Sequence, residues 1–124
     1  QAGNAQIYSS AKGRTALNYV VLVNGNSASA SEILCSGIQD NKEGMLVGTK
    51  TFGKGIIQDV NLLTDGSAVK YTKLQYLSPN GNQIHGIGIT PDVEVELTDD
   101  CYDENGILFN DVQLTKAIEL VKEN

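Results

Sequence analysis

The fold of this chain is constrained most by one stretch of sequence. In it, a continuous apolar run is followed by a tight turn and then by the first residues of a helix. Residues 19–23 (YVVLV) are followed by an Asn-Gly pair at 24–25, and residues 29–32 (SASE) then form a capping-box pattern. An apolar run without polar alternation is typical of a strand buried on both faces of a parallel sheet. The sequence therefore predicts a strand, a turn and a helix that begins at Ser29. This order places Ser29 at the carboxyl end of the strand, where open α/β sheets carry their sites.

The rest of the chain predicts further strands, which together with the helices suit an α/β or α+β fold. Strands are expected at residues 44–48, 56–60 and 68–77, a turn at 78–81 (SPNG), and a last strand in which Val93, Val95 and Leu97 alternate with polar residues. Pro91 fixes a turn ahead of that strand. Asp92 is expected to accept hydrogen bonds in this turn and not to join a reactive site.

Two helices are expected, each with an apolar face. The first carries on one face Ile33, Leu34, Gly37 and Ile38. The second spans residues 110–121 and begins with Asn110 and Gln113 as a capping pair. Its inward face is expected to consist of Leu114, Ala117, Ile118 and Val121.

Length, composition and charge limit the classes of protein to consider. A chain of 124 residues with 40% hydrophobic content can bury one core and is sized for a single domain. The formal net charge of −6, with no Lys/Arg cluster, argues against a nucleic-acid or anionic-membrane partner. No stretch approaches the roughly 20 apolar residues of a membrane span. Residues 1–18 are polar and form an N-terminal edge, with a short extended piece expected at 6–8.

The cysteines and the histidine indicate no metal site. Cys35, Cys101 and the lone His85 lack the spacing of zinc ligands. Cys35 is expected to be a small packed residue and Cys101 a free surface thiol. A disulfide between them is the alternative.

Ser29, Lys54 and Gln58 have the chemistry of a serine–lysine site. A serine hydroxyl needs a neighbouring base, which can be a neutral lysine amine in place of histidine. Because a free lysine has a pKa near 10.4, such a base needs a strongly lowered pKa. Gly53 and Gly55 would let the loop press the Lys54 stem into an apolar site beside a helix N-terminus, and Gln58 would hydrogen-bond the amine.

The same residues have a purely structural interpretation. Ser29 followed by Glu32 is also an ordinary helix cap, and Lys54 in a glycine-rich turn is also an ordinary solvated lysine. The cap and the nucleophile are compatible in space, because the free amides of a first helical turn can hold an oxyanion.

Three motifs give the chain a family resemblance. Residues 27–32 (SASASE), the loop at 51–55 (TFGKG) and residues 86–93 (GIGITPDV) resemble the bacterial carboxyl-terminal processing proteases, the tail-specific proteases of serine peptidase family S41. The likeness runs from about residue 20 to residue 95. It implies that Ser29 is the nucleophile, that Lys54, 25 residues later, is the general base and that Gln58 orients it. It also implies that the Ala30 amide donates to the oxyanion, with no cofactor and no metal.

The resemblance further implies an α/β core with a mixed sheet, of the crotonase or ClpP type, with a long helix after the nucleophile and a C-terminal helix. Residues 19–124 would be the C-terminal part of that core. Family members also contain an extracytoplasmic targeting segment, a PDZ domain that grips the carboxyl end of the substrate, and an upstream core half that supplies a second oxyanion amide. The expected partners are therefore polypeptide C-termini, and the expected location is the periplasm or cell envelope.

The expected function is a serine endopeptidase that cleaves proteins near their C-termini, with this chain as a catalytic-core fragment of little activity by itself. The alternative is a non-catalytic ligand-binding or interaction module of the same fold. In that case Ser29 is only a helix cap.

Overall fold

Three parallel strands form the sheet at the centre of the chain. The computed structural model describes residues 13 and 17–123. The strands are β1 (Val20–Val23), β2 (Met45–Gly48) and β5 (Val93–Glu94), in the order β1-β2-β5. Val21 pairs with Leu46, and Val47 pairs with Val93. The expected extended piece at 6–8, and most of the expected polar edge at 1–18, lie outside the described residues.

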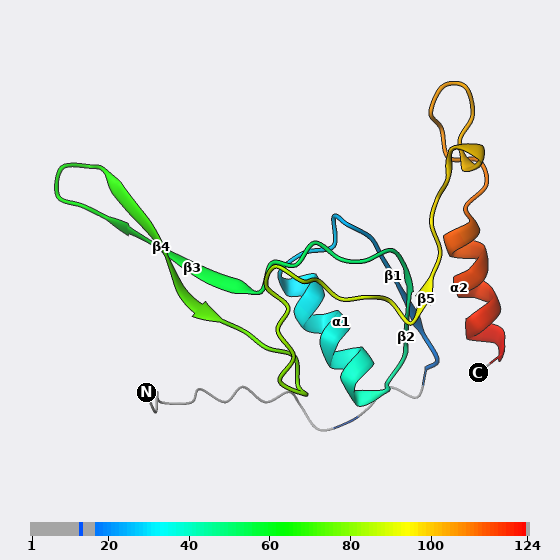
Figure 1. Ribbon diagram of the computed structural model, residues 1–124, viewed down its shortest axis with the longest axis horizontal. Coiled ribbons are helices and arrows are strands. Elements are labelled where there is room, and N and C mark those ends of the chain that lie inside the picture. Colours follow the sequence, from blue (N-terminus) through cyan, green and yellow to red (C-terminus); the bar gives the residue numbers. More distant parts are fainter. Residues whose placement is uncertain (1–12, 14–16, 124) are drawn as a thin grey trace.

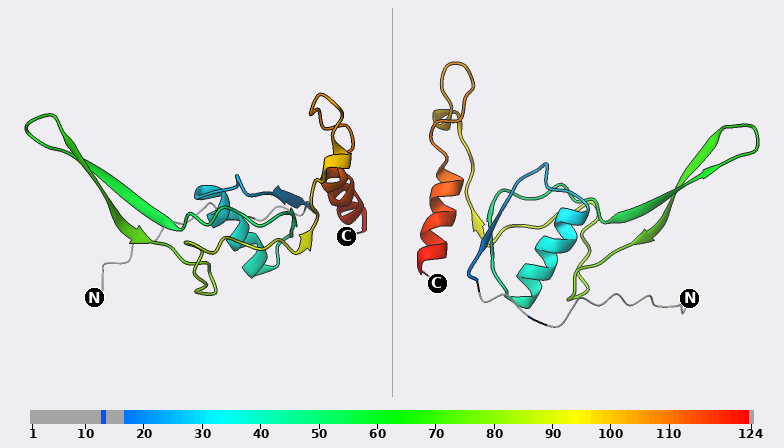
Figure 2. Two further views of the ribbon diagram at one scale, coloured as in Figure 1. Left: turned by 45° about the horizontal axis from the view of Figure 1, so that its top comes forward. Right: turned by 180° about the vertical axis from the view of Figure 1, so that it is seen from behind.

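One helix lies on each side of this sheet. In Figure 1, α1 (Ala30–Asn41) lies on one side and α2 (Val112–Glu123) on the other, and the view from behind in Figure 2 agrees. The hydrophobic core lies between α1, the sheet and the segment that precedes β5. Its buried members are Val23, Cys35, Ile38, Leu46, Ile84 and Ile89.

The expectation that the first strand is buried on both faces is wrong. Only Val23 of β1 is buried, and Leu22 is 42% exposed. The reason is the strand order, which puts β1 at the edge of the described sheet and β2 in its centre. Leu46 and Val47 of β2 are fully buried.

The buried face of α1 also differs from the expected one. Ile38 is buried as expected, but Ile33 and Leu34 are exposed. Glu32, Cys35 and Ile38 face the interior instead. The helix is rotated relative to the expected orientation because the Glu32 carboxylate is hydrogen-bonded to Thr51 and Gly53 beneath the helix start. The face that carries residues 32, 35 and 38 therefore points inward.

A long two-stranded hairpin projects from this core. Strands β3 (Ile56–Leu62) and β4 (Ala68–Gln75) pair antiparallel, and Figures 1 and 2 show that they extend away from the sheet and both helices. The expected turn at 78–81 follows, closed by a hydrogen bond of 2.8 Å from the Gly81 amide to the Ser78 carbonyl. Residues 93–97 show the expected alternation of burial, although only two of them form β5.

The last helix starts later than expected and is capped by another residue. A short 3-10 helix, η1 (Asp99–Cys101), precedes it. Asp111 caps α2, because its Oδ1 accepts the Leu114 amide at 2.8 Å, so the expected pair of Asn110 and Gln113 is wrong. Gln113 and Ala117 are buried against the sheet. The other expected inward residues of α2 keep 38–46% of their surface exposed: Leu114, Ile118 and Val121.

Both cysteines are free and buried. Cys35 is packed as expected, whereas the expectation of a surface position for Cys101 is wrong, since the chain between η1 and α2 folds back over it. The Cys101 carbonyl accepts the amides of Phe109 and Asn110 from that returning segment. Among the described residues, neither helix has the length and apolar character needed to span a membrane.

Candidate active site

Ser29 lies at the entrance of α1, directly after the turn that follows β1. Its backbone has φ 57° and ψ −113°, in a region that residues other than glycine rarely adopt. Such a conformation costs about 1–3 kcal/mol and persists only where the surroundings impose it. The Ser29 amide donates to Glu32 Oε2 at 2.9 Å, and its carbonyl accepts the Glu32 amide at 2.9 Å. The serine is thus held in a strained turn between a strand and a helix.

The carboxylate of Glu32 is fully buried and joins the helix start to the loop after β2. Besides the Ser29 amide it accepts the Thr51 hydroxyl at 2.6 Å, the Gly53 amide at 2.7 Å and the Lys54 amide at 2.8 Å. Burial raises the pKa of Glu32, but these four hydrogen bonds outweigh it, so the pKa lies below its ordinary value. Glu32 is therefore an ionised carboxylate that holds the backbones of Ser29 and Lys54 together.

Lys54 lies on the loop between β2 and β3, next to the start of α1. Gly53 has φ 91°, and a Cβ on Gly55 would lie 2.5 Å from the backbone nitrogen of His85, so the flanking glycines allow the loop to pass this closely. The lysine residue itself is exposed. The expectation that its stem is pressed into an apolar site is not met in this chain, because Gly53 and Gly55 occupy the buried positions and Lys54 points outward between them.

A tyrosine after β4 forms a second link between the two residues. The Tyr76 hydroxyl donates to the Ser29 carbonyl at 3.1 Å and is also hydrogen-bonded to the Lys54 carbonyl. The Tyr76 amide donates to the Gly55 carbonyl at 3.0 Å. Partial burial and the nearby Glu32 carboxylate raise the pKa of Tyr76, so its hydroxyl remains a donor at neutral pH.

Ser29, Lys54 and Gln58 line one open pocket of about 280 Å³. The other lining residues are Ile56, Ile57 and Lys70. Gln58 lies on β3, and its side-chain nitrogen donates a long hydrogen bond of 3.4 Å to Thr72 Oγ1 on β4. Ala30 is the first residue of α1, so its amide has no acceptor within the helix. The structure thus brings the three side chains expected from the sequence to one place, beside the expected oxyanion donor.

Other reactive side chains lie away from this pocket. Asp92 accepts the Leu46 amide at 2.8 Å and the Gln39 side-chain amide at 2.9 Å. Its role is structural as expected, but these partners lie in β2 and α1 and not in its own turn. His85 does not line the pocket, and its Nδ1 is buried without a hydrogen-bond partner among the described residues. Burial and the Glu32 carboxylate raise the pKa of the Cys35 thiol, which disfavours a thiolate.

A larger cavity of about 460 Å³ lies at the other end of α1. Asn18, Lys42, Gly44 and Val121 are among its lining residues, and it contains none of the expected site residues. Within residues 13 and 17–123, no group of three histidine, cysteine or carboxylate side chains is arranged to hold a metal ion.

Structural roles for Thr51 and Tyr76 were not expected from the sequence, and Glu32 was expected only as part of a helix cap. Thr51 is 5% exposed, donates to Glu32 and accepts the Ile89 amide at 2.7 Å. The spacings that could have indicated this cluster are Glu32 three residues after Ser29 and Thr51 three residues before Lys54. No local signal points to Tyr76, 47 residues after Ser29, because the hairpin brings it back.

A strained serine at a helix start and a lysine on a loop line one pocket at the edge of the sheet, as a candidate hydrolase site of an α/β protein would require. Comparison with known proteins agrees with this class. The family model described as peptidase family S41 matches residues 1–95. The chain belongs to peptidase family S41.

Three relatives illustrate this membership. The chain is 48% identical over 75 residues to a probable CtpA-like serine protease of Staphylococcus epidermidis, covering 60% of this chain and 15% of that protein. It is 47% identical over 77 residues to a carboxy-terminal-processing protease of Bartonella bacilliformis, covering 62% of this chain and 18% of that protein. The solved structure of a photosystem II D1 C-terminal processing protease matches with a TM-score of 0.64 and 42% identity, over 79% of this chain and 26% of that one. The chain therefore spans less than a fifth of the two curated relatives.

Proposed function

We propose that this chain carries the nucleophile and the base of a serine endopeptidase that cleaves polypeptides near their C-termini. The observation that carries the proposal is the single pocket lined by Ser29, Lys54 and Gln58. The buried Glu32 carboxylate supports it, because it holds the backbones of the first two residues in one hydrogen-bonded unit. The relatives named as carboxy-terminal-processing proteases support the choice of substrate.

The proposed reaction follows from the roles of these residues. Neutral Lys54 takes the proton of the Ser29 hydroxyl as the oxygen attacks the scissile carbonyl, and a tetrahedral intermediate forms. The Ala30 amide donates to the developing oxyanion. The lysine then passes the proton to the leaving amine. In the second half of the reaction the lysine takes a proton from the attacking water and returns it to the Ser29 oxygen as the acyl group leaves. Gln58 orients the lysine amine.

Glu32 and Tyr76 position this pair and do not react. Ser29 and Lys54 line the same pocket, and the hydrogen bonds of Glu32 and Tyr76 limit how far the lysine loop lies from the serine. Fixed geometry matters, because a displacement of about 1 Å at a catalytic group can cost about 100-fold in rate.

We further propose that the chain works as part of a longer protein. The chain covers less than a fifth of the curated relatives, and the pocket residues Lys54 and Gln58 are exposed. Both observations support this proposal. In that protein an upstream segment would supply the second oxyanion donor and cover the Lys54 side chain, and a PDZ domain would hold the substrate.

Labelling with a fluorophosphonate tests the proposal in the full-length protein. The probe reacts only with an activated serine, so wild type should be labelled at Ser29 and both Ser29→Ala and Lys54→Ala should remain unlabelled. The neighbouring Ser31→Ala is the matched control and should be labelled like wild type. Absence of labelling in wild type, or labelling that survives Lys54→Ala, contradicts the proposal and favours a non-catalytic binding module.

A further inference from the structure

The candidate pocket contains two lysines and no carboxylate. Lys54 and Lys70 both line it, and its other lining residues are uncharged. The chain as a whole has a net charge of −6, so this local excess of positive charge is opposite in sign to the rest of the molecule. Glu32, which is hydrogen-bonded to the Lys54 amide, is buried, and both of its oxygens accept hydrogen bonds.

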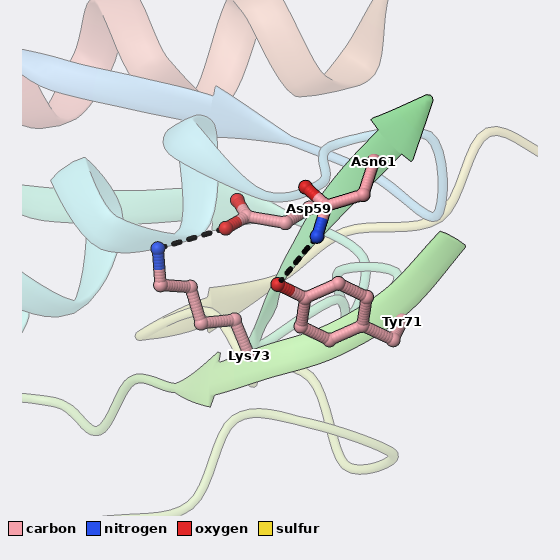
Figure 3. Close-up of polar contacts among 4 residues, drawn as sticks. All are labelled: Asp59, Asn61, Tyr71 and Lys73. Atoms are coloured by element: carbon pink, nitrogen blue, oxygen red, sulfur yellow. Dashed lines mark hydrogen bonds and ion pairs between the residues drawn. The ribbon is translucent and has the colours of Figure 1, made fainter. Parts of the chain in front are cut away.

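The hairpin separates its charges by face. Neighbouring residues of a strand point to opposite faces, so Gln58 and Lys70 share one face and Asp59 lies on the other. On the Asp59 face, Lys73 forms an ion pair of 2.8 Å with Asp59, and Asn61 donates to Tyr71 (Figure 3). Among the residues that the structure describes, the Lys70 ammonium has no hydrogen-bond or ion-pair partner.

Lys70 is therefore an unpaired cation in the pocket that Ser29 also lines. If Lys54 is the neutral base of the proposed reaction, Lys70 is the remaining positive charge of the pocket. Ile56 and Ile57 contribute apolar surface to the same pocket. A substrate side chain with a short apolar stem and a carboxylate end, as in glutamate, complements both features.

We propose that Lys70 forms a subsite for an acidic side chain of the substrate, close to the scissile bond. This inference rests on the proposed peptidase function and deepens it by naming a substrate class. A single exposed ion pair gives a modest preference, so we expect glutamate to be favoured over glutamine by about three- to fivefold at low ionic strength. The preference should fall toward one in high salt, because salt screens exposed charges.

The test uses the full-length protein and a panel of unstructured peptides with one variable position. Glutamate, glutamine or lysine is placed in turn at each position within four residues of the scissile bond, and kcat/KM is measured for each peptide. The same peptides are titrated against Ser29→Ala by fluorescence anisotropy, which reports binding without cleavage.

Three variants isolate the charge. Lys70→Gln should bring the Glu/Gln ratio to about one, and Lys70→Glu should reverse it so that the lysine peptide is preferred. Lys73→Gln, on the other face of the hairpin, is the matched control and should keep the wild-type ratio. A ratio near one at every position in wild type, or a preference that survives Lys70→Gln, overturns the proposal.

The two measurements separate this inference from the proposed function. Cleavage that needs Ser29 but shows no dependence on Lys70 leaves the peptidase standing and rejects the acidic subsite. Binding to Ser29→Ala that prefers glutamate and depends on Lys70, without cleavage by wild type, supports the subsite and rejects the peptidase.

Discussion

Glu32 Oε2 accepts a hydrogen bond of 2.8 Å from the backbone amide of Lys54, which lies 22 residues further along the chain. The same oxygen accepts the Ser29 amide at 2.9 Å. One buried carboxylate oxygen thus connects the residue proposed as nucleophile to the residue proposed as base. The distance between the two backbones depends on Glu32 remaining ionised and in place.

Replacing Glu32 by glutamine should therefore reduce both stability and activity. The glutamine side chain has an NH₂ group where Glu32 has an oxygen, so it faces N–H and O–H donors with hydrogens of its own. Each buried donor that loses its acceptor costs about 1–3 kcal/mol. We expect Glu32→Gln to lower the free energy of unfolding by about 3 kcal/mol and kcat/KM by about 100-fold. Urea unfolding and peptide cleavage measure the two effects. Glu119→Gln removes only an exposed ion pair with Lys116, so it should change the free energy of unfolding and kcat/KM only slightly.

The lowered pKa of Glu32 makes the stability of the chain sensitive to acid. Because the folded state favours the ionised form, the contribution of Glu32 is fully present above its ordinary pKa of 4.5 and is lost as pH falls through the lower folded-state pKa. Urea midpoints measured from pH 7 to pH 3 should show the difference between wild type and Glu32→Gln shrinking over that acidic range. Asp40 and Asp65 also have lowered pKa values, but both remain in the variant, so the difference isolates Glu32. If the difference in urea midpoint between the two proteins stayed constant from pH 7 to pH 3, Glu32 would not be the cause of the acid sensitivity.

Tyr76→Phe should slow the reaction while leaving substrate binding intact. The variant removes the hydroxyl that is hydrogen-bonded to the Ser29 and Lys54 carbonyls, whereas the Ser29 carbonyl still accepts the Glu32 amide. We expect kcat to fall about tenfold, which corresponds to about 1.4 kcal/mol of barrier, with KM within about twofold of wild type. Tyr71→Phe, at the other face of the hairpin (Figure 3), is the control. A change in KM alone would assign Tyr76 to substrate binding.

The local order of elements was predictable from the sequence. The apolar run and the capping-box pattern predicted a strand, a turn and a helix opening at Ser29, and β2 and the two hairpin strands lie close to their expected positions. The pocket gathers Ser29 and Lys54, whose expected proximity followed from parallel strands that end at one edge. It also includes Gln58, which was expected there only from the family resemblance.

Features set by distant contacts were not predictable in this way. The rotation of α1, which exposes Leu34 and buries Glu32, follows from hydrogen bonds to the loop at residues 51–54. The link from Tyr76 to Ser29 depends on the pairing register at the base of the hairpin, where Gln75 lies opposite Ile56. Cys101 is buried by a segment that folds back over it, and its flanking sequence is acidic and polar. Local propensity describes none of these long-range contacts.

The chain as given should have little peptidase activity by itself. Loss of one oxyanion donor costs about 10²–10³ in rate, and Lys54 is exposed in this chain instead of held in an apolar site. An unstructured peptide with an apolar C-terminus should be cleaved at least about 100-fold more slowly by residues 1–124 than by the full-length protein. Equal turnover by the two would show that the site is complete within these residues.

The most direct test of the proposed mechanism is the value of kcat/KM for Lys54→Ala in the full-length protein, measured beside Ser29→Ala and with circular dichroism as a check that both fold. Residues that act as one catalytic unit lose nearly the whole rate when either is removed. We predict that both variants lose detectable peptide cleavage while their unfolding remains cooperative. Activity of Lys54→Ala within about tenfold of wild type, equal to about 1.4 kcal/mol of barrier, would contradict a lysine base and with it the assignment of this site.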